Sequence, residues 1–168
     1  MDAVICGIDP GLGTTGYAIL RRSGENLTIL DAGVCRYPAA DPFENRLVSL
    51  QSDIAAILDD HQPDAIGVEA LYAHYKHPRT AIVMGHARGV ILLEAGRRQI
   101  EVKSLAATQV KRYLTGNGRA SKLQIQRAIK ATLGLPSIPE PPDLADALAI
   151  ALCCIGCLQK SESAEAIA

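Results

Sequence analysis

A chain of 168 residues with 48% apolar side chains can bury one hydrophobic core, so we expect one domain over residues 1–158 and a polar, disordered tail over 159–168. The net charge of −1 argues against nucleic-acid binding by the surface as a whole, and no run of about 18 apolar residues predicts a membrane span. No signal peptide opens the chain, which favours a cytoplasmic protein.

The first half of the chain predicts mainly strands. In chain order the expected elements are strands at 4–8, 17–20 and 27–37, a helix over about 42–61 and a strand at 64–69. Short turns join the first three strands, which indicates an antiparallel meander. The first and the fourth of these strands both end on a carboxylate, Asp9 and Glu69.

The second half predicts mainly helices. The expected elements are a helix over about 79–98, a strand at 100–103, two shorter helices of which the second runs from Ser121 to Gly134, and a buried helix from Asp143. The segment 139–142 is a stiff, non-helical linker. Helical crossovers separate the first, fourth and fifth strands, so these should run parallel. The pattern predicts an α/β fold with a five-stranded mixed sheet flanked by helices.

The five cysteines suit reduced, buried thiols of a cytosolic protein, because their number is odd and three of them lie in one apolar run. Cys154 and Cys157 have the spacing of half a zinc site. No second pair completes it, so we expect no zinc.

Four carboxylates are the candidate catalytic residues. Asp9 and Glu69 follow two buried strands, and sites in open α/β sheets form where strands end. Asp143 and Asp146 share one face of the last helix and would pack beside them. Simpler roles stay open at this stage: Asp9 suits a turn with Pro10, and Asp143 suits the start of a helix.

Four carboxylates in one place repel one another and would protonate unless a cation held them. Ligand sets made only of oxygen suit Mg²⁺, and Mn²⁺ may substitute for it. Two such ions about 4 Å apart stabilise both the attacking and the leaving oxygen in phosphodiester cleavage. The sequence therefore predicts two Mg²⁺ ions in one site.

Positive charge is concentrated in one segment. Residues 103–130 hold seven basic side chains and no acidic one, whereas residues 1–60 hold four basic and nine acidic side chains. Such a patch attracts phosphates, although a solvent-exposed helix face with no binding role would show the same charge pattern.

Several motifs together resemble the RuvC crossover junction endodeoxyribonucleases. They are GIDPG with Gly16 and Tyr17, Glu69 at a strand end, GHARGV (85–90), QVK (109–111), TGNGRASKLQIQ (115–126) and DLADALAIA. The resemblance covers about residues 2–157 and implies a ribonuclease-H-like fold. It also implies that Asp9, Glu69, Asp143 and Asp146 are catalytic metal ligands.

The resemblance implies a homodimer that cuts two opposed strands of a four-way DNA (Holliday) junction during recombination and repair. A branch-migration helicase complex stays open as a further partner, and no membrane is implied. The expected DNA-binding residues are Tyr72, Lys76, Arg79, Lys111, Asn117, Arg119 and Lys122. Tyr72 could stack on an unpaired base at the junction centre or simply cover the sheet edge.

The dimer rests on the resemblance, and we expect its seam on the helix 79–98 because small residues there allow close approach, although this face could instead pack on the sheet. The small or interfacial residues considered there are Ala81, Met84, Gly85, Ala87, Arg88 and Gly89. The loop AHYKHPRT departs from the family by its length, by His77 and by Pro78, and His86 stands where the family usually has Gln. We expect His74, His77 and His86 to be surface or hydrogen-bonded histidines.

Other functions remain to be weighed. The turn DPGLGTTG also resembles the phosphate loop of sugar-kinase and actin-like ATPases, but those need two domains. A catalytically silent junction-binding protein would keep the fold and the basic patch. A related ribonuclease-H-like nuclease could act on single-stranded DNA or on RNA, because fold does not fix substrate.

Overall fold

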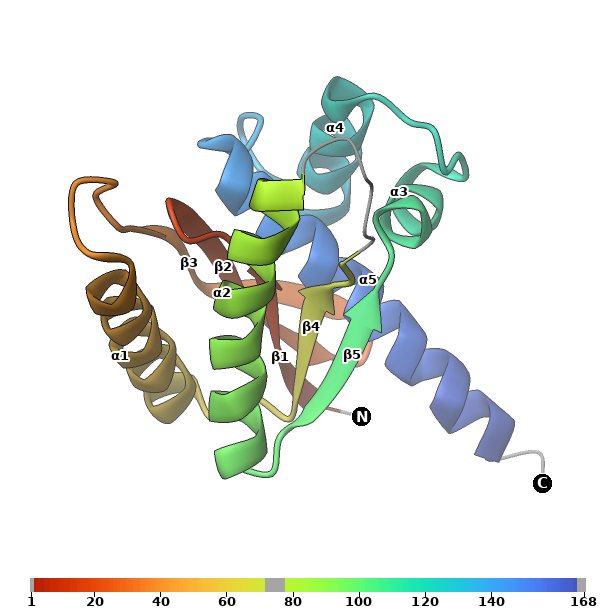
Figure 1. Cartoon of the computed structure of the whole chain (residues 1–168). Helices are drawn as coiled ribbons and strands as arrows, with labels where there is room; N and C mark the ends of the chain where they lie inside the picture. The colour runs from red at the N-terminus through yellow and green to blue at the C-terminus, as the bar shows by residue number, and fades with distance from the viewer. Residues whose placement is uncertain (1, 72–77, 166–168) are drawn as a thin grey trace.

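The computed structural model describes residues 2–71 and 78–165 and contains one five-stranded sheet (Figure 1). Its strands are β1 (Asp2–Asp9), β2 (Thr14–Ser23), β3 (Asn26–Arg36), β4 (Ala65–Glu69) and β5 (Glu101–Leu105). The spatial order is β3-β2-β1-β4-β5. β1, β4 and β5 are parallel, and β2 and β3 are antiparallel to their neighbours, which confirms the predicted mixed sheet.

Helices cover both faces of the sheet. They are α1 (Phe43–His61), α2 (Pro78–Arg97), α3 (Ala107–Thr115), α4 (Lys122–Leu133) and α5 (Pro142–Glu165). Figure 1 shows α1 and α2 side by side in front of the sheet and α5 behind it, with α4 near the start of α5 and α3 farther along it. The order of strands and helices agrees with the sequence prediction.

The central strand β1 is buried on both faces, which explains its continuous apolar run. Its side chains alternate, so Ile5 joins the cluster under α5 while Cys6 and Ile8 join the cluster under α1 and α2. The sheet therefore separates two hydrophobic cores, each covered by its own helices.

Helix α5 is longer than the sequence analysis expected. It starts at Pro142, inside the linker taken as non-helical, because the first position of a helix needs no N–H donor. It ends at Glu165, which corrects the prediction of a disordered tail from 159. No proline or glycine interrupts the chain between 157 and 165, so the helix can continue past the sheet (Figure 1).

The same helix contains an 18-residue window, Pro142–Gln159, that is long and apolar enough to span a membrane by composition. No such run was predicted from the sequence. In the fold, 61% of the window is buried. Its contacts with β1, β2 and β4 identify it as a core helix of the domain.

Candidate active site

Asp9 and Glu69 end two neighbouring parallel strands. β1 and β4 pair in parallel register, which brings their last residues to the same edge of the sheet. Gly7 and Gly67, two positions earlier, both face α5. Because side chains alternate along a strand, Asp9 and Glu69 also lie on the α5 face.

Two glycines allow α5 to approach the sheet closely. A Cβ atom on Gly7 would lie 2.3 Å from the carbonyl oxygen of Ala147, and one on Gly16 would lie 2.1 Å from the carbonyl oxygen of Asp143. Gly16 is also the β2 partner of Asp9. The start of α5 can therefore lie against Asp9 only because residue 16 has no side chain.

The four predicted carboxylates lie within electrostatic range of one another. Burial raises the pKa of Asp9 to about 7, and Asp146, Glu69 and Asp143 each add to the rise. Burial, followed by the charge of Asp146, also raises the pKa of Glu69. Negative charge is thus crowded at the point where β1, β4 and α5 meet.

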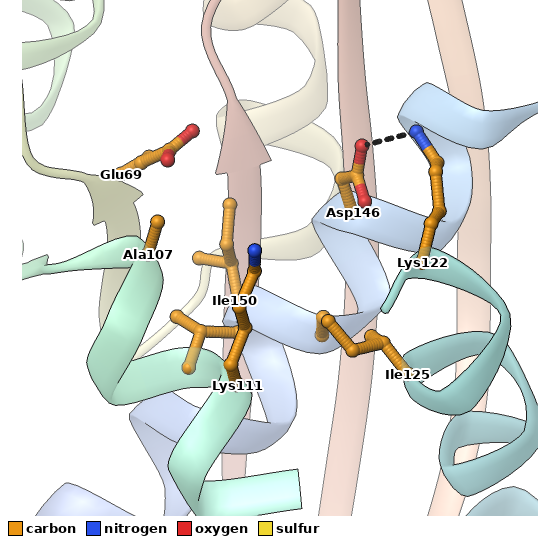
Figure 2. Close-up of a pocket in the computed structure, with 9 residues that line it drawn as sticks. Glu69, Ala107, Lys111, Lys122, Ile125, Asp146 and Ile150 are labelled. Carbon is orange, nitrogen blue, oxygen red and sulfur yellow. Dashed lines mark hydrogen bonds and ion pairs between the residues drawn. The ribbon is translucent and has the colours of Figure 1, made fainter. Parts of the chain in front are cut away.

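Two lysines oppose this charge from α3 and α4. Lys111 lowers the pKa of Glu69, and Lys122 lowers that of Asp9, each against the larger effect of burial. Lys122 Nζ lies 3.1 Å from Asp146 Oδ2 (Figure 2). The two side chains are 53% and 42% exposed, so this is a surface ion pair that another ligand can displace.

These charged groups line a hollow of about 280 Å³, which we call the lysine hollow. Its polar lining consists of Glu69, Lys111, Lys122 and Asp146, and apolar side chains that include Ile125 and Ile150 complete it. In Figure 2 both lysine side chains extend from their helices toward the side where the carboxylates lie.

A second hollow of about 480 Å³ is lined by the other two carboxylates, and we call it the glycine-turn hollow. It is lined by residues 9–14, by Asp143 and by the first turns of α2, which contribute Arg79, Thr80, Val83 and Met84. Asp9 and Asp143 therefore face one hollow, and Glu69 and Asp146 face the other.

The donor set fits a hard divalent cation, since it consists of carboxylates whose crowded charge a cation would relieve. Within residues 2–71 and 78–165, however, no three His, Cys, Asp or Glu side chains stand close enough to hold one ion together. The ion pair with Lys122 engages Asp146. The assignment of all four carboxylates as metal ligands stays a prediction.

The DNA-binding candidates that the structure describes lie on α3, on α4, in the turn between these two helices, or at the start of α2. Asn117 and Arg119 form the turn between α3 and α4, where the Arg119 N–H donates to Asn117 Oδ1 at 2.9 Å. Arg79 lies exposed in the first turn of α2. Tyr72 and Lys76, like His74 and His77, lie outside the described residues.

A capping box closes the start of α4. The Ser121 N–H donates to Gln124 Oε1 at 2.8 Å, and the Gln124 N–H donates to Ser121 Oγ at 3.3 Å. These two N–H groups are therefore already engaged by side chains and are not offered to a phosphate.

Sequence reasoning missed the contacts of two arginines that hold the backbone around the site. Arg46 of α1 donates to the carbonyl oxygen of Leu12 in the glycine-turn hollow. Arg88 of α2 donates through Nε to the carbonyl oxygen of Glu69 at 3.2 Å. Each arginine binds a backbone atom distant in the sequence, and no local motif signals such a contact.

The residues considered for a seam on α2 do not share one surface. Ala87 is fully buried in the monomer, and Met84 lines the glycine-turn hollow. An apolar groove between α1 and α2 is instead lined by Leu47, Ile82, Gly85, His86, Gly89, Val90 and Leu93. His86 is a surface residue as expected, with Nδ1 2.8 Å from the carbonyl oxygen of Ile82 and the ring edge-on to Phe43.

Comparisons with known proteins agree with this geometry. The family model described as crossover junction endodeoxyribonuclease RuvC matches residues 5–154. A crossover junction endodeoxyribonuclease RuvC of Rhodopirellula baltica is 48% identical over 149 residues, which are 89% of this chain and 84% of the relative.

Two solved structures are similar over nearly the whole chain. Thermus thermophilus RuvC superposes with a TM-score of 0.87 at 29% identity, covering 94% of this chain and 96% of that one. The same protein in complex with a Holliday junction substrate gives 0.84 at 30% identity, covering 90% and 92%. These matches confirm the predicted ribonuclease-H-like fold.

Proposed function

This chain belongs to the RuvC family of crossover junction endodeoxyribonucleases, and we propose that it resolves four-way DNA (Holliday) junctions by paired, symmetric, Mg²⁺-dependent nicks. One observation carries the proposal. Four carboxylates from β1, β4 and α5 lie within electrostatic range of one another beside two lysines, in a chain that the family model matches over residues 5–154.

Asp9, Glu69, Asp143 and Asp146 are the residues proposed to hold two Mg²⁺ ions, for which Mn²⁺ could substitute. When bound, the ions supply an activated water and neutralise the charge that develops at phosphorus. The protein's own task is to hold the scissile phosphate in line for attack. The bond to the 3′ oxygen breaks and leaves a 5′-phosphate and a 3′-hydroxyl.

Lys111 and Lys122 are proposed to bind non-bridging phosphate oxygens next to the cut. Their position beside Glu69 and Asp146 supports this role, and cations there stabilise the more highly charged transition state. Lys122 would exchange its partner Asp146 for a phosphate, which the exposure of the pair allows.

The wider DNA contacts are proposed from charge and position. Asn117 and Arg119 lie in the turn between the two lysine-bearing helices, and Arg79 lies at the start of α2. Phosphate contacts of this kind position a duplex without reading its sequence. Tyr72 and Lys76 complete the proposed set on the ground of the family resemblance.

Paired cuts in opposed strands require two active sites, so the working form is proposed to be a homodimer. The groove between α1 and α2 supports an interface there, because Ile82 and Leu93 are 60% and 57% exposed beside it. The protein is proposed to act in the cytoplasm, with a branch-migration helicase complex as a further partner.

The first test incubates the protein and Asp146→Asn with end-labelled four-way junctions, linear duplex and single strands in Mg²⁺. We expect symmetric nicks in the junction alone, and their loss in the variant. Junction binding without nicks in Mg²⁺ or Mn²⁺ would instead identify a silent binder. Equal cutting of duplex or single strands would leave a metal-dependent nuclease but contradict junction selectivity.

A further inference from the structure

The two hollows that meet at the carboxylates differ in chemistry. The lysine hollow presents two lysines, which suits a phosphodiester backbone. In the glycine-turn hollow, Arg79 is the only basic residue among the described residues that line it. The rest of the lining consists of the two carboxylates Asp9 and Asp143, the turn residues 10–14, and Thr80, Val83 and Met84 of α2, of which Val83 and Met84 are apolar.

The carboxylates are shared between the two hollows, with Asp9 and Asp143 in one and Glu69 and Asp146 in the other. A phosphodiester held by all four must therefore lie at their common border. The nucleotide on one side of the cut can then enter the lysine hollow, and the nucleotide on the other side can enter the glycine-turn hollow.

We propose that the glycine-turn hollow is a nucleotide subsite that reads the base on one side of the cut. The apolar wall formed by Val83 and Met84 receives the base, and Arg79 binds its phosphate. The volume of about 480 Å³ lies within the range of small-ligand sites. The Met84 thioether suits a heterocyclic face, since sulfur packs favourably against aromatic rings.

An apolar subsite of this kind selects by shape. An apolar pocket discriminates by about 10- to 200-fold between two substrates that differ by one methylene group. The wall that meets the base is formed by side chains of α2 and the backbone of the turn, so base choice depends on residues outside the metal site. The inference rests on the proposed function, because it requires a DNA strand at the carboxylates.

The test maps the cuts in a junction pool whose bases at the crossover are randomised. We expect Met84→Ala to relax base preference about tenfold at one position next to the cut, with preference at other positions unchanged. Met84→Trp should fill the hollow and slow cutting about tenfold or more while junction binding persists. Val48→Ala and Val48→Trp, on an exposed position of α1, are the matched controls and should behave as wild type.

A second readout does not depend on cutting. A junction with 2-aminopurine next to the expected cut is bound in Ca²⁺, and its fluorescence should rise as the base leaves the stack and enters the hollow. Met84→Trp should abolish the rise, and circular dichroism verifies that the variant is folded. A rise without any cutting would support the subsite and contradict the resolvase. Cutting with unchanged preference in both Met84 variants, and no rise, would overturn the subsite alone.

Discussion

The helices on the two faces of the sheet are held in place by different kinds of contact. On the α5 face, backbone lies against backbone, because Gly7 and Gly16 leave room for the helix. On the α1–α2 face, the helices are joined by a buried polar network around Glu94, which is 1% exposed and bonded to Gln51 and Arg98. The four candidate carboxylates lie on the first face.

This difference shows where the fold can tolerate change. Close backbone packing fixes the position of the α5 carboxylates, and a single methyl group would disturb it. The polar network joins α1 to the last turns of α2, whereas the first turns of α2 line the glycine-turn hollow, so loss of the network should cost stability without moving the site. The comparison can be tested by damaging each face separately.

The largest effect is expected from Gly16→Ala. Its Cβ would lie 2.1 Å from the Asp143 carbonyl oxygen, so α5 must shift. Overpacking of this kind costs about 1–3 kcal/mol in the free energy of unfolding. Displacement of the α5 carboxylates by about 1 Å should also lower junction cleavage by about 100-fold. Denaturant unfolding and single-turnover cleavage measure the two effects.

Gly96→Ala is the matched control for this substitution. Gly96 lies in α2, and a Cβ atom there would meet nothing within 4 Å. We expect a gain of about 0.5–1 kcal/mol from helix propensity and unchanged cleavage. Equal behaviour of the two alanine variants would contradict the role of close packing at Gly16.

The next effect is expected from Glu94→Gln. The substitution keeps the shape of the side chain but removes the charge that binds Arg98 and Arg97. Breaking one partner of a buried pair is costly, and since the arginines are partly exposed we expect a loss of about 1–3 kcal/mol. Cleavage per folded molecule should not change.

The same network predicts a pH dependence of stability. Hydrogen bonds from Arg98, and further ones from Gln51 and Arg97, hold the pKa of Glu94 below its ordinary value of 4.5, against the effect of burial. A lowered folded-state pKa gives stability that is present above about pH 4.5 and is lost as the pH falls below it. Urea unfolding between pH 3 and 7, in about one-unit steps, should show this loss in wild type and a smaller one in Glu94→Gln.

Asp59→Asn serves as the control, because Asp59 is the exposed partner of the same arginine. Its removal should have the smaller effect on stability. A larger loss from Asp59→Asn than from Glu94→Gln would show that the buried carboxylate is not the centre of the network.

The sequence predicted most of the fold because its signals were local. Apolar runs, capping residues and helical spacing lie within a few residues of each element, and they identified the element order and the parallel strands. The prediction for the end of α5 was wrong, since a polar composition does not by itself stop a helix that a buried segment has already nucleated.

The site was only partly predictable. Asp9 and Glu69 could be placed together because strand parity and parallel pairing are general rules. The contacts of Arg46 and Arg88 with backbone carbonyls join residues that are distant in the sequence, so no residue spacing indicates them. The same holds for the division of the carboxylates between two hollows, which follows from how α5 and α2 approach the sheet.

Lys122→Met is expected to have the smallest effect on stability and a specific effect on the salt dependence of junction binding. Its pair with Asp146 is exposed on both sides, so its loss should change the free energy of unfolding by less than about 1 kcal/mol. If Lys122 binds a phosphate in the complex, binding by the wild-type protein releases one more counterion from the DNA than binding by the variant does. The slope of log K against log salt for junction binding should then fall by about 1. Lys130→Met, near the other end of α4, should keep the wild-type slope, and equal slopes for Lys122→Met and wild type would show that Lys122 stays with Asp146.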